Sequence, residues 1–382
     1  MKKIYVITRH HISNYGSLLQ SFATQTVIAE MGYDVRIIDY VRHDEDYHNI
    51  TEVLLKKNPK WNRNAITRCI YRIFQKPEYI MSGKRFREMQ KEYLQLTEKV
   101  SKKDELTRIT ADADILLTGS DQVWGPIGGD QYDSNYFLDF AGSAVKKVSY
   151  AASFGNSELS ETIRPHITSL LSDYSQITVR EKSAVDILTS LGLDRVRQVL
   201  DPTLLLNKSE WGKLIPNIQR KPFVLIYQLH KNDEMDRYAK QFAKKVGLPL
   251  IRVTATPHQM IRSGKTVLLP KLGDFLWYVK NAEYMITDSF HGTAFAINFG
   301  TQFINVLSSG HRSTDASSNI VRTKTRNKSI LELTGLSDRI LSSFDDFSMI
   351  ERKIDYTRVN SILSRSRTES IAELRRLLED RL

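Results

Sequence analysis

The stretch Glu283–Gly300, EYMITDSFHGTAFAINFG, has the pattern of a strand, a tight turn and a helix. Tyr284–Thr287 is a short apolar run, which is typical of a buried strand. The polar residues Asp288–Gly292 follow as a turn, and Thr293–Phe299 is predicted as an apolar helix that ends at Gly300. This is one βα unit of an open α/β sheet. Ligands of such sheets bind outside the carboxyl ends of the strands.

The predicted turn has the features of an anion site. The first turn of a helix offers free N–H groups and the positive end of the helix dipole. Ser289 and Thr293 can cap the helix or bond to a ligand, and Gly292 has no side chain to hold a ligand off the backbone. His291 can meet that ligand with its imidazole. The alternative is a helix capped by Ser289 with His291 as a partly exposed first-turn residue.

Polar and glycine residues follow other predicted strands in the same way. A glycine permits close approach of a ligand, and Asp or Gln side chains can bond to sugar hydroxyls. Trp124 either stacks on a sugar ring or fills the core. The candidate substrate-binding residues at these strand ends are Asn14, Tyr15, Gly16, Gly119, Ser120, Asp121, Gln122 and Ser153.

Arg180 ends a predicted strand beside the start of a helix. There it can grip a carboxylate or phosphate with two parallel bonds. The alternative is a surface ion pair with Glu181 or Asp186. The pair Asp112 and Asp114 resembles a D-x-D metal motif, but it precedes its strand, so we expect a solvated turn and predict no metal site.

Alternating strands and helices predict an α/β protein with two Rossmann-like domains that face a cleft. The expected N-terminal domain spans 1–205 with a helical insertion at about 41–105, the second domain spans 206–350, and a C-terminal helix spans 351–382. The insertion is either a helix with a solvated charged face or a basic amphipathic helix that lies on a membrane or faces a lipid-linked substrate. Its apolar face comprises Ile66, Cys69, Ile70, Ile73 and Phe74.

The composition indicates the cellular compartment and the kind of partner to expect. The single cysteine, Cys69, excludes an internal disulfide framework and fits a reducing compartment. The apolar run near the N-terminus is too short for a signal-peptide core, so we expect a cytoplasmic protein, with peripheral contact at the inner membrane face left open. The net charge of +11 and the pI near 9.4 favour anionic partners. No nucleic-acid-binding motif is present, so nucleic acid is not a predicted partner.

Six segments in order along nearly the whole chain resemble the polysaccharide pyruvyltransferase family. They are NYGSLLQSFATQ (14–25), LLTGSDQVW (116–124), YAASFG (150–155), TVREKSAVDIL (178–188), LDPTLLL (200–206) and TDSFHGTAFAINFGTQF (287–303). The resemblance implies a GT-B-like enzyme that moves the enolpyruvyl group of phosphoenolpyruvate onto a sugar of a surface or capsular glycan. The products are a pyruvate ketal and phosphate, and no cofactor or metal is required.

The resemblance also implies residue roles. The family's elbow histidine matches His291 and its donor-binding arginine matches Arg180, so these two are the expected catalytic residues. Many members carry a further arginine where this chain has Ser289. The replacement cation is then expected from Arg312, Arg322, Lys324 or Arg326. We expect the acceptor, a sugar or lipid-linked glycan, on the first domain and the donor on the second. The oligomeric state is not predicted.

Two other functional classes fit the same architecture. One is a GT-B glycosyltransferase that uses a nucleotide-sugar, and it needs an acidic residue for the ribose or a slot for the base in the second domain. The other is a non-catalytic glycan-binding relative, which should tolerate loss of His291. Donor preference separates the first class from the pyruvyltransferase.

Overall fold

Short, buried apolar runs form the central strands of two parallel sheets. The computed structural model describes residues 1–127, 130–219, 221–307 and 326–379. The strands β4 (Ile115–Thr118) and β11 (Tyr284–Thr287) are buried at every position. This is the pattern of strands that are covered by helices on both faces. All pairings between the described strands are parallel.

The first sheet has seven strands in the order β3-β2-β1-β4-β5-β6-β7. Because the order reverses between β1 and β4, the loops after these two strands open at one crevice. The remaining strands are β1 (Lys3–Ile7), β2 (Asp34–Tyr40), β3 (Leu96–Val100), β5 (Lys146–Ala152), β6 (Gln176–Val179) and β7 (Val196–Gln198). The helices are α1 (Tyr15–Glu30), α2 (Ile50–Lys56), α3 (Ala65–Tyr93), α4 (Lys103–Ile109), α5 (Arg164–Leu171) and α6 (Lys182–Ser190).

The second sheet repeats this plan with five strands in the order β10-β9-β8-β11-β12. Its order reverses between β8 and β11, so the loops after those strands share a crevice too. The elements are α7 (Lys208–Gly212), β8 (Val224–Tyr227), α8 (Asp233–Val246), β9 (Leu250–Thr254), β10 (Lys265–Leu268), α9 (Leu272–Asn281), α10 (Phe290–Phe299), β12 (Gln302–Asn305), a helix over 326–334 and α12 (Tyr356–Glu379). Single-turn 3₁₀ helices are η1 (Ser134–Phe137), η2 (Pro202–Leu204), η3 (Pro257–Ile261), η4 (Ser337–Arg339) and η5 (Ser348–Ile350).

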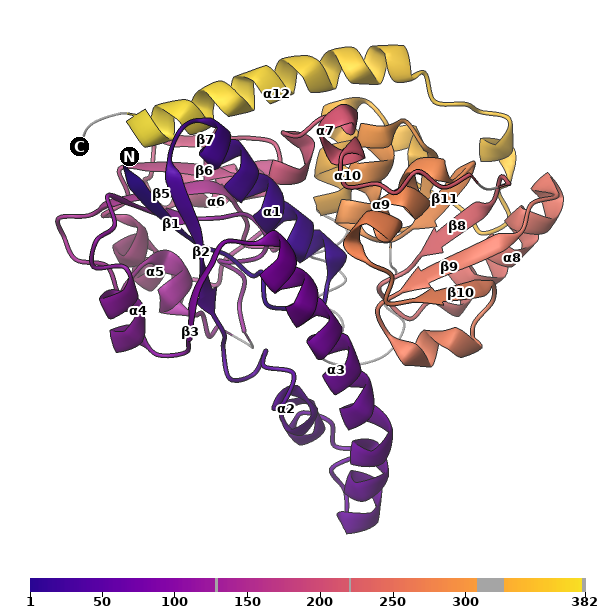
Figure 1. Ribbon diagram of the computed structural model, residues 1–382, viewed down its shortest axis with the longest axis horizontal. Coiled ribbons are helices and arrows are strands. Elements are labelled where there is room, and N and C mark those ends of the chain that lie inside the picture. The colour runs from indigo at the N-terminus through magenta and orange to yellow at the C-terminus, as the bar shows by residue number, and fades with distance from the viewer. Residues whose placement is uncertain (128–129, 220, 308–325, 380–382) are drawn as a thin grey trace.

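One hydrophobic core joins the two domains. It contains Leu117 of the first sheet and Leu225 of the second. The helix α12 runs across both domains (Figure 1). The Tyr356 hydroxyl, at its start, donates to a carbonyl of the second domain, and Ser370 Oγ accepts from the Leu200 amide of the first at 3.0 Å. The C-terminal helix therefore folds back on the first domain, and the expected GT-B-like pair of Rossmann-like domains is confirmed.

Two predicted boundaries were wrong. The helix α10 begins at Phe290 rather than Thr293, because Ser289 caps it and so brings His291 into the first helical turn. The predicted insertion also contains β3, the edge strand of the first sheet. β3 has the sequence LTEKV and is mostly exposed or half-buried, so it lacks the apolar run of the central strands.

Candidate active site

A cleft of about 610 Å³ lies where the loops of the two switch points meet. The first domain contributes Arg9 after β1 and Asp121 after β4. The second domain contributes His230 after β8, and Ser289 and His291 after β11. The arrangement follows from the two strand orders, because the carboxyl ends of the central strands carry the binding loops.

The first turn of α10 forms one wall of the cleft. Ser289 Oγ accepts the Gly292 amide at 3.1 Å, and the Ser289 carbonyl accepts the Thr293 amide at 3.0 Å. Both amides are therefore used inside the helix. Within the described part of the chain, the amides of Phe290 and His291 have no acceptor. They are the first-turn donors left for an anion.

The imidazole of His291 is held between two neighbours. Its Nε2 is fully buried and lies 3.7 Å from Asp201 Oδ2, an ion-pair distance that is too long for a hydrogen bond. On the other side the ring packs on the start of α1, where a Cβ on Gly16 would fall 2.1 Å from Nδ1. Only 7% of the side chain is exposed, and it lines the cleft. Nδ1 is thus the ring nitrogen left to meet a ligand.

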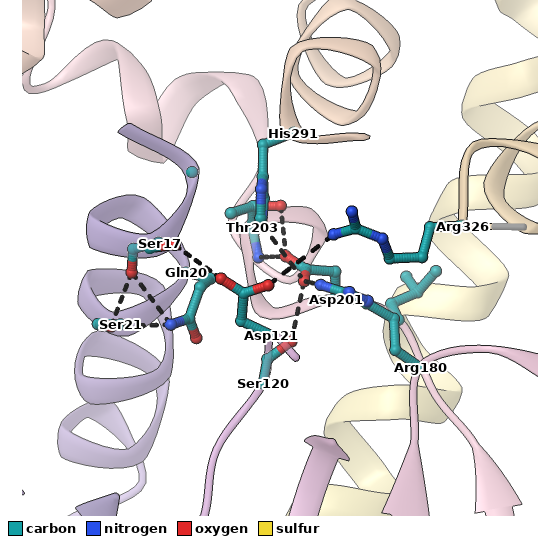
Figure 2. Close-up of polar contacts among 12 residues, drawn as sticks. Ser17, Gln20, Ser21, Ser120, Asp121, Arg180, Asp201, Thr203, His291 and Arg326 are labelled. Atoms are coloured by element: carbon teal, nitrogen blue, oxygen red, sulfur yellow. Dashed lines mark hydrogen bonds and ion pairs between the residues drawn. The ribbon is translucent and has the colours of Figure 1, made fainter. Parts of the chain in front are cut away.

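Asp201 is the buried anchor beneath this ring (Figure 2). Its Oδ1 accepts the Thr203 amide at 2.9 Å and the Thr203 hydroxyl at 2.7 Å, and its Oδ2 accepts from Ser120 Oγ and Arg180 Nη1, each at 3.0 Å. Burial opposes its charge, but His291 and Arg180 hold the pKa of Asp201 well below its usual range. The sequence prediction missed this residue, although it lies in the segment LDPTLLL.

Arg180 lies behind the cleft lining rather than in it. Its side chain is 2% exposed, and its Nε donates to Glu181 at 2.7 Å. The guanidinium also lies over the Phe290 ring, 4.4 Å from the centroid, and Nη2 is buried with no hydrogen-bond partner among the described residues. We expected direct contact with a ligand or a surface ion pair. The structure instead gives a buried ion pair that fixes Asp201 and the start of α10.

Within the described ranges, three arginines line the cleft that holds His291, namely Arg9, Arg42 and Arg326, and Arg42 is paired with Asp44. Arg9 forms an ion pair with Glu45, and in the part of the chain that the structure describes its buried Nε has no hydrogen-bond partner. The sequence prediction missed Arg9, because the loop after the first strand was interpreted from His10 onward.

Arg326 Nη1 lies 4.0 Å from Asp121 Oδ1. Burial and the charge of Arg180 lower the pKa of Arg326 to about 10, so the guanidinium stays charged at neutral pH. Arg326 was one of four cations nominated from the sequence. The other three lie outside the described residues, namely Arg312, Arg322 and Lys324.

Asp121 brings an ionised carboxylate to the same cleft. Its φ is 74°, a strained value for a residue with a side chain, and Ser17 Oγ donates to its Oδ2 at 2.6 Å. Burial would raise the pKa of Asp121, but the charges of His291, Arg180 and Arg326 lower it to about 2. Ser17 was not predicted. Three predicted first-domain residues line the cleft, namely Asn14, Asp121 and Gln122.

Other predicted residues lie in the core. Tyr15 is fully buried, stacks on Phe275 at 4.4 Å and donates its hydroxyl to the Pro270 carbonyl at 2.7 Å. Trp124 is fully buried and stacks on Phe137 at 5.5 Å, which settles its role as a core residue. These two aromatic rings therefore support the loops from within the core.

Gly119 and Ser153 also lie behind the cleft lining. A Cβ on Gly119 would meet the Thr8 side chain at 3.0 Å, so the glycine is needed for packing of the loop. Ser153 Oγ accepts the Gly155 amide at 3.0 Å. Neither lines the cleft that holds His291.

Two groups of residues bear on metal binding. The ligand atoms of His10, His11 and Asp39 lie within 4.8 Å of one another, but Asp39 is already paired through both oxygens with Arg87. The Arg87 guanidinium therefore already balances the charge of the Asp39 carboxylate, which would otherwise be available to a metal ion. Asp112 lies in an exposed turn and accepts from Lys3 Nζ.

Comparisons with known proteins fit this geometry. A family described as polysaccharide pyruvyl transferase matches residues 14–311. A structure described as "putative UDP-N-acetylglucosamine 2-epimerase from Listeria monocytogenes" has 10% identity and a TM-score of 0.55, with 99% of this chain and 97% of that chain covered. At this identity the likeness shows the fold alone. The E. coli heptosyltransferase WaaC with ADP has 11% identity and a TM-score of 0.39, with 95% and 99% covered.

No curated protein matches the sequence. In the described ranges, no helix is both long and apolar enough to cross a bilayer. The match to the family model extends from the loop after β1 to beyond β12, so it includes the switch-point residues Asn14, Asp121 and His291, and also Asp201. The chain therefore belongs to the polysaccharide pyruvyl transferase family.

Proposed function

We propose that the protein transfers the enolpyruvyl group of phosphoenolpyruvate to a sugar of a surface or capsular polysaccharide precursor. The observation that carries this proposal is the grouping of Arg9, Arg326 and His291 around one cleft, next to the two unbonded amides of the α10 first turn. Phosphoenolpyruvate carries both a carboxylate and a phosphate. Arginines and a helix N-terminus are the groups that bind such anions.

The reaction balances without a cofactor. Two sugar hydroxyl oxygens form bonds to C2 of the enolpyruvyl group, and the bond from C2 to the phosphate oxygen breaks. One hydroxyl proton is matched by the proton gained at C3, which becomes a methyl group. The other is matched by the proton gained by the departing phosphate. The products are a pyruvate ketal and inorganic phosphate.

We assign proton delivery to C3 to His291, through Nδ1. Asp201 and Arg180 are positioning residues, because they hold the ring and the α10 start without reaching the cleft. Arg9, Arg326 and the free amides bind the donor anions. An acid of this kind contributes about 10²- to 10⁴-fold to turnover.

The first domain supplies the acceptor side in this proposal. Asn14 and Gln122 orient the sugar hydroxyls. A carboxylate with a pKa of about 2 is a weak base at neutral pH, so we assign Asp121 to hydroxyl orientation and to stabilising positive charge at C2. The hydroxyl proton then passes to the departing phosphate.

The test supplies phosphoenolpyruvate or nucleotide-sugars with a panel of sugar acceptors. Phosphate release and a gain of one pyruvate less one water on the acceptor support the proposal. His291→Ala should lose about 10²- to 10⁴-fold in turnover. The control His166→Ala changes an exposed residue of α5 and should retain activity.

Thermal unfolding gives a second readout. A donor at a hundred times its Kd should stabilise the fold by about 2.7 kcal/mol. Stabilisation by a nucleotide-sugar and none by phosphoenolpyruvate would favour the glycosyltransferase class instead. Normal pyruvyl transfer by His291→Ala would exclude the assigned acid.

A further inference from the structure

An arm formed by α2 and the first half of α3 extends away from both domains (Figure 1). We define the arm as residues 50–81. Several apolar residues of its α3 part are not packed on the body: Ile66 is 72% exposed, Ile73 62% and Phe74 70%. Ile70 and Met81 are exposed as well. Most of these residues follow three- and four-residue steps, so they form a stripe along one helix face.

The rim of the stripe is basic. Residues 56–76 include seven Lys and Arg and no Asp or Glu. Arg72 pairs with Glu52 of α2, with two bonds of 2.7 Å. A groove of about 570 Å³ on the arm combines both features, because it is lined by Arg72, Lys76, Pro77, Ile80, Met81 and Lys84. An exposed apolar stripe with a basic rim is the pattern of a helix that lies in an anionic bilayer interface.

The arm is rigidly connected to the candidate active site. Ser82 Oγ donates to the Ala255 carbonyl at 2.7 Å, and Glu78 bonds to His258 Nδ1 at 2.8 Å, so α3 is fixed to the second domain just beyond the exposed stripe. The following turn is fixed too, because a Cβ on Gly83 would meet the Tyr47 ring at 2.2 Å.

The inner face of the arm walls the cleft. Val53 and Leu54 of α2 and Lys57 just after it line the cleft, and so do Glu78 and Tyr79 of α3. The arm therefore carries the exposed stripe and part of the cleft wall in one connected unit.

From these features we infer that the arm binds an anionic lipid bilayer and presents the cleft to a sugar carried on a lipid. This inference rests on the proposed function for the identity of the acceptor. The membrane contact itself does not, because the stripe and its rim lie outside the catalytic residues. The described helices do not span a bilayer, so the arm would provide a peripheral attachment.

Vesicle flotation, done without donor or acceptor, tests the contact. The full chain should bind vesicles of equal parts phosphatidylcholine and phosphatidylglycerol. It should bind pure phosphatidylcholine at least 10-fold more weakly, and added salt should weaken binding to the anionic vesicles. Equal binding to both vesicle types, or none to either, would overturn the inference.

Matched variants locate the binding surface. Ile66→Ser with Ile73→Ser should weaken binding at least 10-fold, because two exposed apolar side chains no longer enter the interface. The control Ile218→Ser with Ile261→Ser removes two exposed isoleucines elsewhere and should bind like the wild type. Light scattering should show the same oligomeric state for all three proteins. If the wild type and the control were dimers and the arm variant were a monomer, the stripe would be assigned to contact with a second copy of the chain instead.

Activity then separates the two proposals. The arm variant should keep wild-type turnover on a soluble acceptor and lose turnover on a vesicle-borne acceptor. Wild-type turnover on both would overturn the link between arm and acceptor. Vesicle binding without transfer of pyruvate to any acceptor would leave the arm assigned and refute the proposed function.

Discussion

Substitution of Gly16 by alanine should reduce activity while leaving the fold almost unchanged. Gly16 is the second residue of α1 and does not have a left-handed φ, so the backbone accepts alanine. Within a helix, alanine is favoured over glycine by about 0.5–1 kcal/mol. Helix propensity alone therefore predicts a stabilising change.

The new methyl group would instead meet the imidazole of His291. Its Cβ would lie 2.1 Å from Nδ1, 2.3 Å from Cγ and 2.7 Å from Cβ of that residue. Non-bonded carbon atoms settle at about 3.5–4.0 Å, so the ring must shift by roughly 1 Å or more. A misplacement of that size costs about 10²-fold in rate. Overpacking costs about 1–3 kcal/mol, part of which the helix propensity offsets.

Turnover and urea unfolding of Gly16→Ala measure both effects. Gly212→Ala is the control, because Gly212 is also helical and a Cβ there meets no atom within 4 Å. A double-mutant cycle with His291→Ala identifies the cause: the loss should be much smaller when the ring is absent, because only the contact with Cβ remains. Full activity of Gly16→Ala, or an equal loss in the His291→Ala background, would refute the reasoning.

Two further predictions concern stability. Burial holds the pKa of His11 at about 3, below its value of 6.5 in the unfolded chain, so stability should fall as the pH drops below 6.5. The loss should reach about 2 kcal/mol at pH 5, and His11→Gln should remove it in urea titrations at pH 7.5 and 5. Asp201→Asn should cost about 3–5 kcal/mol at neutral pH, because Arg180 loses one of its buried partners. The pKa of Asp201 is depressed in the fold, so the gap between variant and wild type should close as the pH falls below 3.8.

The sequence predicted the elements that lie at the centre of each sheet. A central parallel strand must be buried on both faces, and the predicted strand Tyr284–Thr287, which is buried at every position, matches β11. Edge strands are freed from this requirement. β3 was therefore taken for part of an insertion, and only its pairing with β2 identifies it.

The residues that follow central strands were predictable for the same topological reason. Asn14, Asp121 and His291 all reach the cleft. The burial of each side chain was not predictable, because it depends on contacts between segments that are distant in the sequence. Arg180 is covered by the helix start that carries Phe290, and Arg9 is fixed by Glu45, which lies 36 residues away.

Position 289 shows how the same charge can come from a different element. Where the family resemblance places an arginine, Ser289 caps α10, and a cap of this kind contributes about 1 kcal/mol. Arg326, at the start of the helix over 326–334, lines the same cleft, and its guanidinium lies 4.0 Å from Asp121. The attraction between an anion and a cation depends on the distance between them, and not on which residue of the sequence carries the cation. The exchange therefore retains a charged arginine in the cleft and leaves the α10 first turn with a cap and two free amides.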